Sequence, residues 1–292
     1  MRSGPLYSAR RGPRRPARRC AMPEEILYDV DDRVATITLN APERLNAISR
    51  RMQQEIIDAL EEAERDHGIH VALIQGAGRA FSTGYQLGAP AAEDTGRPYS
   101  PTSDRDNIED GLRLWLRIPE LRLPVIAKVR GYCIAGAPPL AAICDVTGVA
   151  EDTRVGSGPQ LPLGAGYVTA FWAWHMGPKR AKQFAFPSGE FITGEQAAEY
   201  GLFNEAVHPE ILDEYVEDYV RRISKVPKDV LAIHKLSANR IQELQGMRTA
   251  LRTGAELDAI AHFSPDVEAM RESVRDMGVR GAIDAWKSQL RS

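Results

Sequence analysis

Hydrophobic and polar positions alternate near the start of the chain and predict a hairpin followed by a helix. Residues 26–30 and 33–40 are apolar at every second position, which is typical of two paired strands. From 49 to 66 the apolar residues recur at helical spacing instead, behind Ser49 as a plausible N-cap. The apolar face of this helix comprises Met52, Ile56, Ile57 and Leu60.

Strands and helices alternate through the middle of the chain. Short apolar segments at 70–76, 124–132 and 145–150 predict buried strands, and 108–118 predicts a helix. This alternation indicates βαβ units and a mostly parallel sheet. Residues 88–107 are rich in Pro, Gly, Ser and Asp and lack periodicity, so we expect a long loop there, either a lid or a disordered segment.

The last third of the chain has helical periodicity almost throughout. A short capped helix is predicted at 193–202. Four amphipathic helices are predicted after it, at 212–226, 227–244, 248–263 and 265–278.

Composition is that of an ordinary globular protein. The 292 residues are 43% hydrophobic and 26% charged, enough for a large core. A net charge of −3 favours neither nucleic acid nor an anionic membrane as partner, and no apolar run reaches the roughly 20 residues of a membrane span. Three cysteines of unrelated spacing fit a reducing, cytoplasmic location, and the six histidines show no metal-ligand spacing.

The first 22 residues differ from the rest, with seven arginines, three prolines and no acid. They cannot bury a core, so we expect a disordered extension at 1–22, before an α/β core at 23–207 and a helical region at 208–292. Three interpretations remain open: a mitochondrial presequence, a nucleic-acid-binding arm, or an extension without function before a native start at Met22. We favour the last, since prolines disrupt the amphipathic helix of a presequence.

Two glycine-rich turns, each after a predicted strand, are the candidate ligand sites. They are "GRAFSTGYQL" at 78–87 and "GYCIAGAPPL" at 131–140. Turns at the carboxyl ends of parallel strands gather backbone N–H groups, and a helix N-terminus adds more. Two such turns can hold one oxygen, as an oxyanion hole does for a thioester enolate. For the first turn alone, the φ angle of Gly84 is an equally good explanation.

Four segments in order resemble the crotonase, or enoyl-CoA hydratase/isomerase, superfamily: "NAPERLNAIS", "GRAFSTGYQL", "LPVIAKVRGYCIAGAPPLAAICD" and "FITGEQAAEYGLFNEAV". The resemblance runs from about Ile26 to the C-terminus. It implies an α/β fold, a spiral of ββα units with a C-terminal helical trimerisation region. It also implies an acyl-CoA substrate, no cofactor besides this coenzyme A, and a homotrimer or homohexamer.

The resemblance implies roles for particular positions. The oxyanion-hole donors would be the backbone N–H groups of Tyr85 and Gly136. Arg44, Leu45 and Asn46 would lie against the pantetheine and adenosine end of the coenzyme.

Two departures from the family pattern concern the glutamates of hydratases. Pro139 occupies the position of the first. The second falls at Pro159 counted forward, or at Ser157 counted backward, and no carboxylate is present in either register. Addition of water needs a base and an acid, so ordinary hydratase activity is not expected. Pro138 and Pro139 fit the first turn of a helix, where N–H groups are free anyway.

Weaker candidates for proton transfer or water orientation are Glu109, Asp110, Tyr132, Ser157, Gln160 and Tyr167. For the two acids a solvated helix face is favoured, and for the two tyrosines packing is favoured. Cys133 is expected to be inert, as buried cysteines usually are. The aromatic segment 171–175 is interpreted first as a core helix and second as the wall of a bulky acyl pocket.

The sequence therefore predicts an acyl-CoA enzyme of fatty-acid-type metabolism that stabilises an enolate. It would act as a lyase, decarboxylase, isomerase or hydrolase on an acyl group larger than crotonyl. The alternative is a non-catalytic acyl-CoA-binding or scaffold protein. The acyl chain, the reaction subtype and the group that replaces the glutamates stay open.

Overall fold

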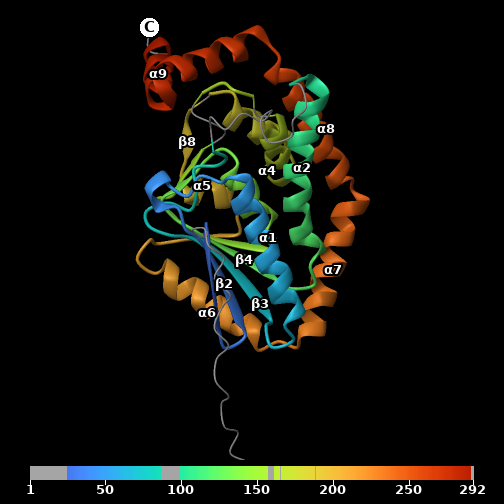
Figure 1. Cartoon of the computed structure of the whole chain (residues 1–292). Coiled ribbons are helices and arrows are strands. Elements are labelled where there is room, and N and C mark those ends of the chain that lie inside the picture. Colours follow the sequence, from blue (N-terminus) through green and yellow to red (C-terminus); the bar gives the residue numbers. More distant parts are fainter. Residues whose placement is uncertain (1–24, 87–98, 157–160, 165, 188, 291–292) are drawn as a thin grey trace, which may run out of the picture.

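A six-stranded sheet lies at the centre of the structure, a computed structural model that describes residues 25–86, 99–156, 161–164, 166–187 and 189–290 (Figure 1). The strand order is β1–β2–β3–β4–β6–β9. Only β1 and β2 are antiparallel. The strands are β1 (Ile26–Asp31), β2 (Val34–Leu39), β3 (Val71–Gly76), β4 (Val125–Val129), β6 (Val146–Ala150) and β9 (Glu205–Val207).

Both faces of the sheet are covered by helices. Helix α6 (Leu212–Ser224) packs on one face, where it contacts Val71 and Leu73 of β3. The alternate β3 residues, Ala72 and Ile74, belong to the main core on the other face. Burial on both faces explains why β3 is apolar without alternation, as in parallel sheets generally.

The main core lies between the sheet and a layer of helices. The first two are α1 (Arg50–Arg65), capped by the Ser49 hydroxyl as predicted, and α2 (Pro101–Glu120). Helix α8 packs against both α2 and α4, as Figure 1 also shows. The remaining helices are η1 (Pro42–Arg44), α3 (Ala137–Ile143), α4 (Gly166–Ala185), α5 (Gly194–Glu199), α7 (Lys228–Leu244), α8 (Met247–His262) and α9 (Pro265–Gln289).

Two sequence predictions are wrong in detail. Helix α2 begins at Pro101, so residues 101–107 are helical and not part of a loop. The reason is a capping box, in which the side chains of Ser100 and Ser103 bond each other's backbone N–H groups. Most of the predicted loop, 87–98, lies outside the described residues, as does the arginine-rich extension.

The predicted strand at 124–132 is in fact two strands. It breaks at Gly131, whose φ of 69° turns the chain, and β5 (Tyr132–Cys133) joins a second sheet. The other strands of that sheet are β7 (Arg154–Gly156) and β8 (Phe191–Ile192). None of the helices in the described ranges combines the length and apolarity that crossing a bilayer requires.

Candidate active site

The two glycine-rich turns lie side by side. Phe81 N–H donates to the Arg130 carbonyl at 2.9 Å, and Ile134 N–H donates to the Ser82 carbonyl at 3.1 Å. A Cβ atom on Gly84 would lie only 2.6 Å from the backbone nitrogen of Gly136. The two turns therefore approach each other closely, and this approach depends on a residue without a side chain at position 84.

Two hydrogen bonds of the first turn flank Tyr85. Ile48 N–H donates to the Gly84 carbonyl at 2.7 Å, and Gln86 N–H donates to the Ile48 carbonyl at 3.0 Å. In a parallel bridge of this kind the residue between them, Tyr85, directs its own N–H to the opposite side. Neither Tyr85 N–H nor Gly136 N–H has a backbone acceptor within the described part of the chain.

The second turn leads directly into α3. Ala135 adopts a φ of 55°, an uncommon left-handed conformation that occurs where structure is over-determined, such as ligand sites. Gly136 is the N-cap of α3, and Pro138 and Pro139 occupy its buried first turn. Ala137 N–H donates to the Ile134 carbonyl at 3.0 Å and the two prolines have no N–H, so Gly136 alone can offer a backbone donor here, and position 139 holds no carboxylate. Residues 157–160, with Ser157, Pro159 and Gln160, lie outside the described residues.

The segment expected to meet the coenzyme supports the first turn. Asn46 is fully buried, and its side-chain amide donates to the carbonyls of Ala77 and Ala80 at 2.9 and 2.8 Å. Thr83 N–H donates to the Leu45 carbonyl at 3.1 Å. The Asn46 side chain therefore holds the first turn by hydrogen bonds.

Arg44 and Leu45 lie beside Asn46 in the chain, and Arg44 forms an ion pair with Glu25. Contact of Arg44, Leu45 and Asn46 with coenzyme A stays a prediction.

Aromatic side chains cover the paired turns. A Cβ atom on Gly136 would lie 2.5 Å from the Tyr85 ring, so this ring packs directly on the second turn. The Tyr85 hydroxyl accepts a hydrogen bond from Trp115 Nε1 at 2.8 Å and lies 3.4 Å from the Tyr167 hydroxyl. Burial raises the pKa of both tyrosines, so both phenols keep their hydrogens at neutral pH.

The other sequence candidates pair with arginines. Glu109 is buried, with 8% exposure, so the solvated helix face favoured for it is wrong. It pairs with Arg105 at 2.9 Å; burial acts to raise its pKa, but the bonds to Arg105 and Arg113 outweigh it and lower the pKa. Asp110 is exposed and pairs with Arg113. Tyr132 accepts a hydrogen bond from Arg154 at 3.3 Å.

The structure agrees with an inert, buried Cys133 and with a core position for the first residues of the aromatic segment 171–175. Cys133 is fully buried, and burial raises the pKa of its thiol well above the usual value, so it carries no reactive thiolate. Phe171 and Trp172 are fully buried in the core as predicted, whereas Trp174 and His175 are half-buried.

Sequence reasoning missed two groups near the turns. Trp115 is one apolar residue among several in its helix, and periodicity does not single out its indole nitrogen. Asp258 and His262 lie four residues apart on α8, a spacing that places both on one helix face but does not reveal what that face meets.

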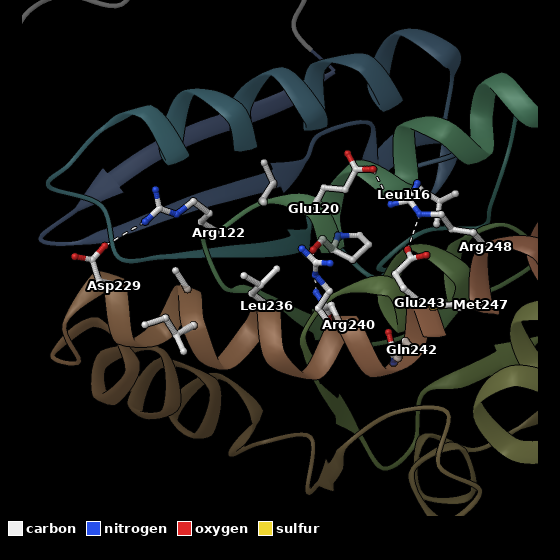
Figure 2. Close-up of a pocket in the computed structure, with 15 residues that line it drawn as sticks. Leu116, Glu120, Arg122, Asp229, Leu236, Arg240, Gln242, Glu243, Met247 and Arg248 are labelled. Carbon is white, nitrogen blue, oxygen red and sulfur yellow. Dashed lines mark hydrogen bonds and ion pairs between the residues drawn. The ribbon is translucent and has the colours of Figure 1, made fainter. Parts of the chain in front are cut away.

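A groove elsewhere on the surface is not part of this site. It has a volume of about 730 Å³ and lies between α2 and α7, where Leu116, Leu236 and Met247 line it. Several of its charged residues pair with one another, including Arg122 with Asp229 at 3.2 Å (Figure 2). None of its lining residues belongs to the two turns.

The fold defines a crotonase-type protein, with a parallel-rich sheet and two glycine-rich turns that lie against each other. The chain belongs to the enoyl-CoA hydratase/isomerase family, whose model matches residues 29–274. The resemblance and the fold class inferred from the sequence are both confirmed.

Individual relatives agree. An enoyl-CoA hydratase/isomerase from Xanthobacter autotrophicus Py2 is 37% identical with a TM-score of 0.81, over 90% of this chain and 96% of that one. An enoyl-CoA hydratase from Mycobacterium smegmatis is 32% identical with a TM-score of 0.81, over 88% and 91%. The 2,3-dehydroadipyl-CoA hydratase of Escherichia coli K12 is 29% identical over 224 residues, which are 75% of this chain and 84% of the relative.

Proposed function

We propose that the chain binds an acyl-CoA thioester and stabilises the enolate formed from it. The supporting observation is the close approach of the two turns, with Gly84 against the backbone nitrogen of Gly136. The N–H groups of Tyr85 and Gly136 would hold the thioester oxygen, on which negative charge develops. Fixed donors of this kind typically supply the largest single contribution to such reactions.

The absence of a carboxylate at position 139 and in 157–160 supports a reaction other than ordinary hydration. Hydration needs a group that activates water and a group that protonates the neighbouring carbon. We therefore propose a lyase, decarboxylase, isomerase or hydrolase of acyl groups larger than crotonyl. Relatives of the chain are named hydratases, so the rate of crotonyl-CoA hydration is the reference with which the proposed activities are compared.

A panel of CoA esters tests the proposal. Purified full-length protein is incubated with crotonyl-, longer enoyl-, malonyl- and β-ketoacyl-CoA, and binding is measured by calorimetry in parallel. We expect turnover of at least one ester and slow or no hydration of crotonyl-CoA. Binding without any turnover would instead favour the non-catalytic, scaffold alternative, and neither binding nor turnover would refute the proposal.

We also propose assembly into a trimer or hexamer through the C-terminal helices. Their outer faces expose large apolar side chains, including Leu236 at 56%, Leu244 at 84% and Ile260 at 67%. Exposed apolar area on this scale is typical of protein contacts. Sedimentation equilibrium should give three or six times the chain mass of 32.3 kDa. A monomer mass at micromolar concentration would contradict the assembly.

A further inference from the structure

Three hydrogen-bond donors and two acceptors lie together beside the first turn. The donors are the Trp115 indole N–H and the hydroxyls of Tyr85 and Tyr167, and the acceptors are the two hydroxyl oxygens. Trp115 Nε1 donates to the Tyr85 hydroxyl, whose oxygen lies 3.4 Å from the Tyr167 hydroxyl oxygen. An indole nitrogen only donates, whereas each phenol donates one hydrogen and also accepts. The two contacts use two of the three hydrogens. One hydroxyl hydrogen of the tyrosine pair is therefore surplus, with no acceptor within the described residues.

This surplus hydrogen lies in a largely buried place. Trp115 is fully buried and Tyr167 is 4% exposed. A buried donor without a partner destabilises the site. An oxygen atom that arrives with a ligand and accepts this hydrogen bond therefore gains affinity that a hydrocarbon group in the same place lacks.

The tyrosine pair lies beside the two donors of the proposed function. The Tyr85 ring packs against Gly136, and in the proposed function Tyr85 and Gly136 supply one backbone N–H each. An acyl group whose carbonyl oxygen is held there would run along the Tyr85 ring towards its hydroxyl.

A buried acid cluster lies beside the start of α4. Asp258 of α8 is 7% exposed, and its carboxyl lies near the backbone N–H groups of Gly166 and Tyr167. His262 Nε2 lies 3.6 Å from Asp258 Oδ1, and His262 Nδ1 lies 2.7 Å from Asp104 Oδ2 of α2. Three helices thus meet at this point, with Asp258 next to the backbone from which the Tyr167 side chain begins.

We propose that the site selects acyl groups that carry a further oxygen atom, and that this oxygen accepts the surplus hydrogen bond of the Tyr85–Tyr167 hydroxyl pair. Asp258 is a positioning residue that acts through Tyr167. The inference rests on the proposed function, because it requires the thioester carbonyl to bind at the two N–H groups. Sites built to bond a substrate oxygen reject analogues that lack it, since their own polar groups are then left unpaired.

The test compares the affinities of matched esters, so it does not depend on turnover. Calorimetry on the full-length protein measures hexanoyl-CoA and its 3-hydroxy, 4-oxo and 5-oxo derivatives. We expect at least one derivative to bind about 10-fold tighter than hexanoyl-CoA or better, as one additional buried hydrogen bond allows. If hexanoyl-CoA binds as tightly as every derivative, the inference is overturned while the proposed function stands. Binding of none of the four overturns both.

Tyrosine variants test whether the preference for oxygen-bearing esters depends on the Tyr85–Tyr167 hydroxyl pair. The double variant Y85F/Y167F removes both hydroxyls, because either single variant leaves one hydroxyl hydrogen, and we expect the preference to fall below about 3-fold. Y215F/Y219F, a stacked tyrosine pair on α6, is the matched control and should keep the preference. Retention of the preference in Y85F/Y167F would overturn the inference.

The positioning role of Asp258 is tested by the same affinity ratio. D258A removes the side-chain oxygens beside the Tyr167 N–H, whereas D258N retains one oxygen that can accept a hydrogen bond there. We expect D258A to lower the preference for the oxygen-bearing ester and D258N to restore most of it. General structural damage would weaken both esters equally, so a D258A variant with an unchanged ratio would remove Asp258 from the proposal.

Discussion

The variant G84A should lose about 100-fold or more in turnover of any ester that the wild-type chain processes, as removal of a single oxyanion donor does in other enzymes. The new Cβ would lie 2.6 Å from the nitrogen of Gly136 and 2.7 Å from the Ile134 carbonyl oxygen. Both are backbone atoms, so the two turns must separate. The N–H groups of Tyr85 and Gly136 would then no longer reach one oxygen. Steady-state kinetics, with calorimetry for ester affinity, measure this loss.

G246A is the matched control for backbone strain. Gly84 has a φ of 85° and Gly246 a φ of 91°, and a Cβ on Gly246 would meet nothing within 4 Å. Both variants carry the cost of a left-handed residue, about 1–2 kcal/mol, but only G84A moves the turns. We expect G246A to lose stability and keep its turnover. Turnover of G84A within about 3-fold of wild type would show that the paired N–H groups are not the site.

The parts of the site that sequence could predict are those made by the backbone. A strand, a turn of small residues and a helix start are local features, so the two turns follow from the pattern at 78–87 and 131–140. The helices at 49–66 and 227–244 were predicted for a similar reason, because an apolar stripe over several turns is a strong signal.

The parts that sequence could not predict depend on side chains that meet across the fold. Tyr85 and Tyr167 are 82 residues apart, and His262 and Asp104 are 158 apart. No pattern of neighbouring residues predicts a contact between side chains so far apart in the sequence. The strands β5 and β8 are two residues long, too short to show alternation. The start of α2 was missed because its capping serines have the composition of a loop.

A buried ion pair joins the C-terminal helices to the sheet. Lys235 Nζ of α7 lies 2.7 Å from Asp145 Oδ2 and also donates to the carbonyls of Ile118 and Leu123 at 2.9 and 2.8 Å. The lysine side chain is only 4% exposed. Asp145 precedes β6 and also accepts the Val125 N–H at 2.7 Å. The pair thus fixes α7 against the ends of α2 and the beginnings of two strands.

The variant K235M should lower the free energy of unfolding by about 3–5 kcal/mol, because it leaves a buried carboxylate and two carbonyls without their partner. Chemical denaturation at neutral pH measures it. R122A is the control, since the Arg122–Asp229 pair is 71% and 87% exposed and should contribute less than about 1 kcal/mol. A K235M loss no larger than that of R122A would contradict the assignment.

The pH dependence of K235M identifies the cause of its instability. Burial already raises the pKa of Asp145, and Lys235 opposes that rise, so removal of the lysine raises the pKa further. A carboxyl whose folded pKa exceeds its unfolded value favours the folded state at low pH and loses that contribution as pH rises. The deficit of K235M should therefore shrink as pH falls towards 4. K235M/D145N should be more stable than K235M at pH 7, because its amide carries no charge to leave unpaired. A deficit independent of pH and unchanged by D145N would instead assign the loss to the two carbonyls.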